Sequence, residues 1–212
     1  MKKIYDRGHR IIGLTGMYCA GKNYVARMLE ARGLPVLDVD TLGHQAIETE
    51  KGAILQRFGA EILGKDGAVD RRALGAKVFG SPRELTALEE IVHPAANRLT
   101  EQWIAGIPEG PCVINAALLH RSVVFSRLDW VIIVQAPFLT RFLRARRRDR
   151  LPVLPLLRRF KSQREFMSQY LSQHADIYRV HNRGYFGICS RVWRRALEHR
   201  IDDLLSREGI RR

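Results

Sequence analysis

The sequence predicts an α/β fold, with helices on both faces of a parallel sheet, from three observations. Short apolar runs of strand length recur along the 212 residues. Stretches with helical spacing separate these runs, and no tight hairpin joins two of them. A chain that leaves one strand and returns through a helix must cross over, so its strands run parallel and its helices cover both faces.

The first predicted elements form a βαβ unit. Residues 10–15 are an apolar run that stops at Gly16, which is typical of a buried parallel strand. Residues 22–32 have helical spacing, and Gly33 is the cap expected just past a helix end. Residues 34–39 are predicted to form the second strand.

The later elements continue this alternation. Residues 41–106 are predicted to be mostly helical. One helix among them opens with Ser81 as N-cap, Pro82 at the first helical position and Glu84 as the capping-box partner. The other predicted elements are strands at 111–115, 130–135 and 177–181, a helix that starts at Pro137, and helices at 156–173 and 190–206.

Composition excludes several classes of protein. Glycine and proline, at 17 and 8 residues, are close to their average share, which excludes a collagen-like or low-complexity chain. No apolar run is long enough to span a membrane, and the basic start precedes an apolar run too short for a signal peptide. We therefore expect no membrane partner and a cytoplasmic location. Cys19, Cys112 and Cys189 match no zinc spacing, and their odd number argues against a disulfide framework.

The charge balance indicates anionic partners. A formal net charge of +14 suggests either nucleic acid or phosphate-rich small molecules. Residues 141–170 alone hold ten basic and two acidic side chains. Aromatic residues do not alternate with these arginines, as they would in a platform that stacks single-stranded nucleic acid. A basic nucleic-acid-binding protein is therefore the less favoured alternative, from another class.

The stretch Gly16-Met-Tyr-Cys-Ala-Gly-Lys22 has the spacing G-x-x-x-x-G-K of a phosphate-binding P-loop. It lies between a predicted strand and a predicted helix, which is the context that this motif requires. Backbone N–H groups of such a loop surround a phosphate, and Lys22 reaches the β- and γ-phosphates. The motif predicts a P-loop NTPase-like sheet, and the alternative is a glycine-rich turn with a surface lysine.

One position departs from the motif. Asn23 stands where a Ser or Thr hydroxyl binds Mg²⁺. An amide oxygen can ligate Mg²⁺, but it lies one atom farther out, and Mg²⁺ tolerates little geometric error. Three outcomes stay open: Asn23 ligates the metal directly, acts through water, or holds it less well.

Two acids and several arginines complete the candidate site. Asp38 and Asp40 end the second predicted strand, where alternation points both the same way at the ligand-binding edge. Either acid could orient or deprotonate an attacking hydroxyl, and the alternative for Asp40 is the N-cap of a helix starting at Thr41. In the basic stretch, Arg148 and then Arg144 are favoured to face a transferring phosphoryl group. Most of the other arginines are expected on a solvated helix face.

These residues resemble the dephospho-CoA kinase family over nearly the whole chain. The matching segments are residues 12–16, 21–22, 35–40, 70–74, 78–79, 91–94, 148–149, 175–176 and 182–184. Residues 70–74 and 91–94 are the specific ones, because generic P-loop kinases lack them in this order. The resemblance implies a parallel-sheet core, a helical substrate-side domain and a helical lid. It also implies transfer of the γ-phosphate of ATP to the ribose 3′-hydroxyl of dephospho-CoA, with Mg²⁺ as the metal.

The resemblance implies roles for particular residues. Asp40 would be the catalytic base, and Lys22 and Arg148 would be the catalytic cations. ATP would contact Gly16, Cys19, Ala20, Gly21, Lys22, Asn23, Tyr24, Asn182 and Gly184. The substrate side would include Asp38, Arg72, His93 and Arg144.

The chain is expected to be a single kinase domain in three parts. The parts are a core at about 8–40, 108–140 and 176–212, an acceptor-side helical insertion at 41–107, and a lid at 141–175. Residues 117–121 depart from the family, since its Pro-Leu-Leu-x-Glu pattern becomes Ala-Leu-Leu-His-Arg and loses an acid. The alternatives are a weakly active nucleotide-binding relative and a nucleoside or nucleotide kinase. The sequence makes no prediction of oligomeric state.

Overall fold

The computed structural model describes residues 8–161, 176–184 and 190–210. The chain forms two compact units, one made of the residues up to Leu37 and from Pro108 onward, the other of Asp38–Ile107. The division into core, insertion and lid stays a prediction, and residues 162–175 of the lid lie outside the described residues. Among the helices that are described, none is both long and apolar enough to cross a membrane.

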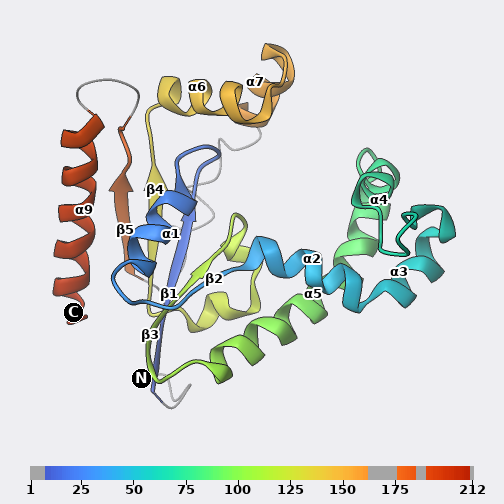
Figure 1. Ribbon diagram of the computed structural model, residues 1–212, viewed down its shortest axis with the longest axis horizontal. Coiled ribbons are helices and arrows are strands. Elements are labelled where there is room, and N and C mark those ends of the chain that lie inside the picture. The colour runs from blue at the N-terminus through green and yellow to red at the C-terminus, as the bar shows by residue number, and fades with distance from the viewer. Residues whose placement is uncertain (1–7, 162–175, 185–189, 211–212) are drawn as a thin grey trace. The chain divides into compact units, whose positions relative to one another are not determined.

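The first unit is built on a five-stranded sheet, labelled in Figure 1. Its strands are β1 (His9–Gly16), β2 (Val36–Asp38), β3 (Gly110–Asn115), β4 (Trp130–Gln135) and β5 (Asp176–His181). Its helices are α1 (Lys22–Glu30), α6 (Phe138–Asp149), α7 (Val153–Lys161) and α9 (Ser190–Arg207), with 3-10 helices η2 (Leu119–Arg121) and η3 (Val123–Arg127). The helix predicted at 156–173 thus begins earlier, at Val153, and its part after Lys161 lies outside the described residues.

The sheet has the strand order β2-β3-β1-β4-β5, so β1 is central. β1 pairs in parallel with β3 and β4, and β4 pairs in parallel with β5. The strands predicted at 10–15, 111–115, 130–135 and 177–181 are confirmed within one residue at each end. The predicted α/β class is confirmed, and the parallel pairings place the carboxyl ends of β1, β3, β4 and β5 at one edge.

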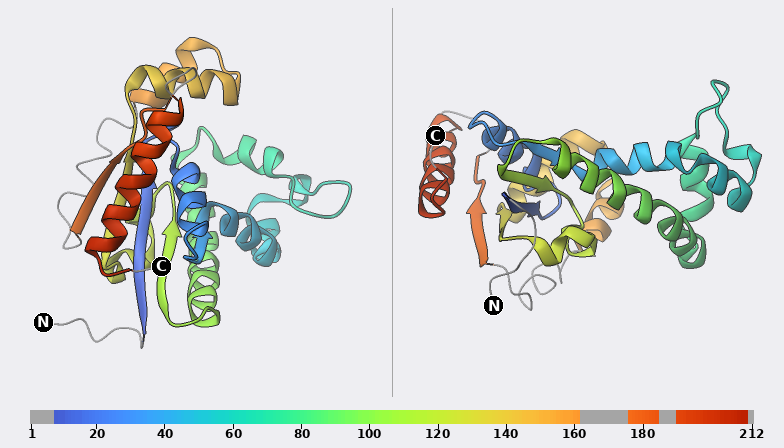
Figure 2. Two further views of the ribbon diagram at one scale, coloured as in Figure 1. Left: turned by 60° about the vertical axis from the view of Figure 1, so that its left-hand side comes forward. Right: turned by 90° about the horizontal axis from the view of Figure 1, so that it is seen from below.

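Side chains of β1 alternate between the two faces of the sheet. Ile12 and Leu14 are fully buried in an apolar cluster that also contains side chains of α1 and α9. Gly13 points to the opposite face, where a Cβ would lie 2.7 Å from the side chain of Leu119 in η2. On the first face, α9 lies alongside β5, as Figure 2 shows. The central strand is therefore covered on both sides, as apolar runs in parallel sheets require.

The second strand is shorter than predicted, and this corrects the placement of two acids. β2 ends at Asp38, and helix α2 (Val39–Thr49) begins at the next residue. Asp38 caps this helix, because its carboxylate accepts a hydrogen bond from the N–H of Asp40 at 3.1 Å. Alternation along a strand therefore does not apply to Asp38 and Asp40, and the N-cap is Asp38 rather than Asp40.

The second unit is mainly helical, as predicted for residues 41–106. After α2 come α3 (Lys51–Phe58), the 3-10 helix η1 (Ala60–Ile62), α4 (Arg71–Val78) and α5 (Pro82–Gly106). Buried side chains such as Ile54 and Leu74 form its apolar cluster. The predicted cap of α5 is confirmed, since the Ser81 hydroxyl accepts from the N–H of Glu84 at 3.4 Å.

Candidate active site

The loop between β1 and α1 has the geometry of a phosphate-binding loop. β1 ends at Gly16 and α1 begins at Lys22, so the predicted strand–loop–helix context is present. Cys19 and Gly21 have left-handed backbone angles, with φ of 57° and 94°. The first N–H groups of α1 have no earlier carbonyl to bind within the helix, and they carry the positive end of its dipole. An anion at the end of this loop would therefore be stabilised.

Neither motif glycine has room for a side chain. A Cβ on Gly16 would lie 2.8 Å from the carbonyl oxygen of Val134, in β4. A Cβ on Gly21 would collide with Nδ2 of Asn182, the residue after β5. The loop therefore lies directly against two neighbouring strands, and the left-handed φ of Gly21 gives a second reason for glycine there.

Arg144 of α6 and Asn182 hold the loop through its carbonyl groups. Arg144 Nη1 donates to the carbonyl oxygens of Ala20 at 3.0 Å and Cys19 at 3.4 Å. Its Nη2 donates to Asn182 Oδ1 at 3.2 Å and to the carbonyl oxygen of Gly184. Asn182, only 6% exposed, donates from Nδ2 to the carbonyl oxygen of Ala20 at 2.9 Å. These contacts favour a positioning role for Arg144, and its contact with substrate stays a prediction.

Arg148 lies near the end of α6 in a cluster with Asp149 and Tyr18. Its Nε donates to Asp149 Oδ1 at 2.6 Å, and its guanidinium carbon lies 5.2 Å from the centre of the Tyr18 ring. The Tyr18 hydroxyl donates to the same carboxylate. The hydrogen bond from Arg148 holds the pKa of Asp149 below its ordinary value, while burial and then the bond to Asp149 raise the pKa of Tyr18. The Arg148 side chain remains 61% exposed, so it is accessible to an anion.

Arg141 is an exception to the solvated face expected for most arginines of α6. It is 8% exposed, and its guanidinium carbon lies 5.0 Å from the centre of the Phe160 ring in α7. Its Nε and Nη1 have no hydrogen-bond partner within the described part of the chain. Burial lowers the pKa of this guanidinium.

Asn23, the departure from the motif, faces Asn115 at the end of β3. Asn115 Nδ2 donates to Asn23 Oδ1 at 3.3 Å. Asn115 is 1% exposed, and its own Oδ1 is buried without a partner in the described ranges. Sequence reasoning missed Asn115, because only the pairing of β3 with β1 brings it beside the loop. The available signal was a polar residue at the end of an apolar strand.

The Asn23–Asn115 pair does not fit a Mg²⁺ ion held by the protein. Proteins usually bind Mg²⁺ through one or two carboxylates, together with water and substrate phosphates. Here both side chains are neutral amides, and Asn23 Oδ1 already accepts a hydrogen bond. No group of three or more His, Cys, Asp or Glu side chains that could hold a metal occurs among the described residues.

The other loop residues predicted to contact ATP differ in how far they are buried and in what they contact. Ala20 is buried, and its carbonyl oxygen accepts hydrogen bonds from Arg144 and Asn182. Burial raises the pKa of the Cys19 thiol, which keeps it neutral. Lys22 is half-buried at the start of α1, and Tyr24 packs against the apolar cluster under the sheet.

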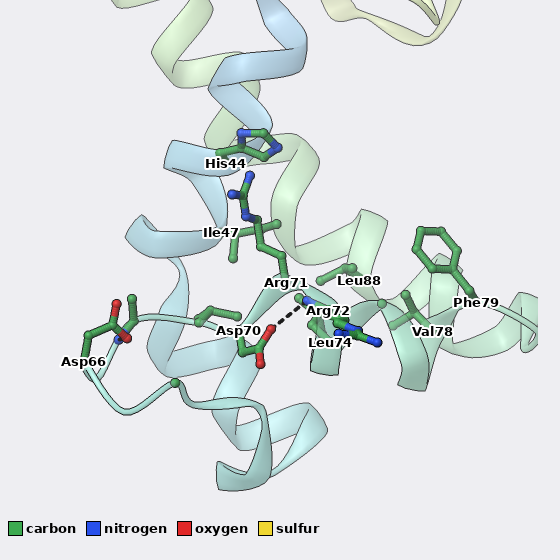
Figure 3. Close-up of a pocket in the computed structure, with 14 residues that line it drawn as sticks. His44, Ile47, Asp66, Asp70, Arg71, Arg72, Leu74, Val78, Phe79 and Leu88 are labelled. Carbon is green, nitrogen blue, oxygen red and sulfur yellow. Dashed lines mark hydrogen bonds between the residues drawn. The ribbon is translucent and has the colours of Figure 1, made fainter. Parts of the chain in front are cut away.

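The second unit contains a cavity of about 770 Å³ beside α4, shown in Figure 3. Arg71, Arg72 and His44 contribute polar or cationic groups to its lining. Phe79 also lines it and is 75% exposed, which is unusual for so large an apolar side chain. Asp70 caps α4 by accepting from the N–H of Arg72 at 2.8 Å, drawn as the dashed line in Figure 3. The predicted substrate-side residue Arg72 therefore lies at a cavity.

The other predicted residues of this unit do not line that cavity. Asp40 is exposed in the first turn of α2, directly after its cap Asp38. His93 is exposed on α5. The structure thus brings Asp38 and Asp40 together at one helix start and places Arg72 and His93 on separate helices.

Comparisons with known proteins point to one family. The sequence profile of the dephospho-CoA kinase family matches residues 10–183. A dephospho-CoA kinase of Treponema pallidum is 32% identical over 210 residues, covering 94% of this chain and 96% of the relative. One from Anaeromyxobacter dehalogenans is 41% identical over 146 residues, covering 66% of this chain and 69% of the relative. A crystal structure of a Thermus thermophilus protein matches with a TM-score of 0.74 at 30% identity, covering 93% of this chain and 99% of that one. The nucleic-acid-binding alternative is not favoured by these matches.

Proposed function

This chain belongs to the dephospho-CoA kinase family, and on that premise we propose which of its residues carry the reaction. The enzyme transfers the γ-phosphate of ATP to dephospho-CoA and so forms coenzyme A. In our proposal, residues 16–24 hold the phosphates of ATP. The observation that supports this best is the strand–loop–helix geometry, with Cys19 and Gly21 left-handed and Lys22 at the helix start.

Lys22 and Arg148 supply positive charge in this proposal. Lys22 binds the β- and γ-phosphates as a compact cation. During transfer, negative charge spreads over the oxygens of the phosphoryl group, and a guanidinium matches this arrangement. Arg148 suits the task because it is exposed and is oriented by Asp149 at 2.6 Å.

Asp40 acts as the general base. The 3′-hydroxyl oxygen of dephospho-CoA forms a bond to the γ-phosphorus, while the bond from that phosphorus to the bridging oxygen breaks and ADP leaves. The hydroxyl proton moves to the Asp40 carboxylate. Asp38 fixes the first turn of α2, because its carboxylate accepts the N–H of Asp40 at 3.1 Å.

Separate parts of the chain recognise the two substrates. Asn182 and Gly184 form the adenine-side segment, and this segment is fixed by the Asn182 N–H, which donates to the Gln135 carbonyl at 2.7 Å. The cavity beside α4 binds dephospho-CoA, whose diphosphate suits the guanidinium groups of Arg71 and Arg72. Mg²⁺ is the expected metal, and it would arrive with ATP. The proposed location of the enzyme is the cytoplasm.

Release of ADP with different acceptors tests this function. The full chain receives saturating ATP and Mg²⁺ together with dephospho-CoA, adenosine or a nucleoside monophosphate. Of the three acceptors, we expect only dephospho-CoA to give ADP release well above background. Faster turnover with adenosine or a monophosphate would favour a nucleoside or nucleotide kinase, and absence of turnover with dephospho-CoA would contradict the proposal.

A further inference from the structure

The contact beside Lys22 is electrically neutral on both sides. Asn23 is the second residue of α1, and Asn115 is the last residue of β3, opposite Leu14 of the central strand. The two amides meet through a hydrogen bond from Asn115 Nδ2 to Asn23 Oδ1 at 3.3 Å. An amide has no charge at any pH at which the protein is folded, so this contact adds none to the site.

P-loop kinases commonly hold Mg²⁺ with the hydroxyl that comes after the lysine and with a separate aspartate. In this chain the hydroxyl position is Asn23, and the side chain that touches it is Asn115. The Asn23–Asn115 contact, at the position where such kinases bind the metal, therefore contains no carboxylate. Asn23 Oδ1 accepts its hydrogen bond from Asn115 Nδ2, and an ionised aspartate at position 115 could not donate this bond.

The missing carboxylate changes which form of ATP the site prefers. Metal-free ATP carries about four negative charges, and a carboxylate close to its phosphates would repel it. Mg²⁺ relieves that repulsion in an ordinary P-loop site by neutralising part of the charge. The Asn23–Asn115 contact adds no such repulsion, while the Lys22 ammonium and the dipole of α1 still attract the phosphates.

We propose that Asn23 and Asn115 remove the dependence of ATP binding on the metal, so that metal-free ATP binds at least as tightly as Mg-ATP. The two asparagines are then specificity-determining residues for the charge state of the nucleotide. This inference rests on the proposed role of residues 16–24 in binding ATP. It concerns binding alone, and the metal remains a partner of the nucleotide rather than of the protein.

Calorimetric titration of the full chain with ATP tests the inference. One titration contains EDTA and the other contains excess MgCl₂, at equal ionic strength. For the unmodified protein, we expect the two dissociation constants to agree within about threefold, or the metal-free form to bind more tightly.

Two variants return a carboxylate to the contact. Asn23→Asp changes an exposed side chain in the first turn of α1, where an acid is compatible with the helix dipole, so the fold should persist. We expect it to weaken metal-free ATP about tenfold or more relative to Mg-ATP. Asn115→Asp should act in the same direction from the buried side. Asn97→Asp makes the same charge change on α5 of the other unit and should leave the ratio unchanged.

The outcomes separate this inference from the proposed function. An unmodified protein that binds ATP only in the presence of Mg²⁺ overturns the inference and leaves the proposed function intact. Absence of ATP binding in both titrations overturns the inference and the proposed function. An Asn23→Asp variant with an unchanged ratio overturns the role given to the asparagines.

Discussion

The two units use their polar side chains in opposite ways. Around the loop of the first unit, Arg144 and Asn182 are directed at backbone carbonyls, and Asn182 is almost fully buried. In the second unit, Asp40, Arg72 and His93 are exposed, and the helix caps beside Asp40 and Arg72 bind neighbouring residues. We therefore expect that the proposed nucleotide loop is held in place before ATP arrives, and that the proposed acceptor side takes its final arrangement from its substrate.

The comparison has an energetic consequence. Removing a partner from a buried carbonyl costs about 1–3 kcal/mol, because the carbonyl is left without its hydrogen bond. Replacing an exposed polar side chain usually changes the free energy of unfolding by about 0.5 kcal/mol or less. Substitutions around the loop should therefore alter both stability and ATP binding, and substitutions on the acceptor side should alter kinetics alone.

Lys22→Ala should have the largest effect. It removes the cation at the β- and γ-phosphates, and we expect kcat to fall about 10³-fold, in the range seen when one electrostatic stabiliser is lost. The measurements are ADP release and calorimetric ATP binding. Arg27→Ala, at the exposed end of the same helix, should retain both. Unchanged turnover in Lys22→Ala would remove Lys22 from the phosphate site.

Asp40→Asn should come next. The base is lost while the exposed side chain keeps its size, so kcat should fall by about 10² or more. ATP binding and thermal stability should stay at the values of the unmodified protein. Glu30→Gln, an acid-to-amide change at an exposed position of α1, is the matched control. A variant with a normal rate would show that another group accepts the proton.

Arg144→Ala tests directly whether the hydrogen bonds of Arg144 hold the loop in place. The carbonyls of Ala20 and Cys19 lose a donor, so the free energy of unfolding should fall by about 1–3 kcal/mol and ATP should bind about tenfold more weakly. Arg146→Ala, an exposed arginine of the same helix, should change neither quantity. A loss of kcat with stability intact would instead indicate direct contact of Arg144 with substrate.

Arg72→Ala probes the acceptor side by the same logic. Loss of a charge-assisted contact should raise KM for dephospho-CoA about tenfold, which corresponds to about 1.4 kcal/mol. KM for ATP and the unfolding midpoint should not move. Arg83→Ala, exposed at the start of α5, serves as the control. An equal rise in both KM values would contradict separate recognition of the two substrates.

Asp149→Asn should have the smallest effect, and that effect should depend on pH. The folded-state pKa of Asp149 is lowered, so its stabilising contribution is present above the unfolded pKa of about 3.9 and is lost as pH falls through the folded-state value. Because Arg148 is largely exposed, the contribution should not exceed about 1 kcal/mol. Denaturant unfolding at neutral and acidic pH should show a difference between variant and parent that disappears on acidification. A difference that does not shrink as the pH is lowered would assign it to packing.

The features predicted correctly from the sequence depend on local pattern. β4, for example, is an apolar run bounded by polar residues, and no distant partner is needed to recognise it. The P-loop has the same property, because its glycine and lysine spacing already specifies the turn and the helix start. The prediction that the strand continues through Val39, with Asp40 as the possible helix cap, was wrong because of a local conflict. Apolar alternation through Val39 favours a strand, while the Asp38 side chain favours a helix cap.

The features that were missed depend on contacts between distant segments. Asn115 matters because β3 pairs with β1, and nothing near it in the sequence specifies that neighbour. Arg141 is buried because Phe160 from α7 covers it, although its own helix is rich in exposed arginines. Tyr18 and Asp149 meet across 131 positions of sequence. Such contacts depend on tertiary packing, which helical or strand periodicity does not encode.

The hydrogen bonds of Arg144 also limit how the molecule can open. Its guanidinium binds the loop at Ala20 and the segment after β5 at Gly184, so α6 cannot swing away without losing both attachments at once. Phe160 of α7 packs edge-on against the Tyr18 ring of the loop and lies beside the Arg141 guanidinium of α6, so α7 is attached to the same assembly. We therefore expect the phosphate loop, α6 and α7 to travel through each turnover as one piece.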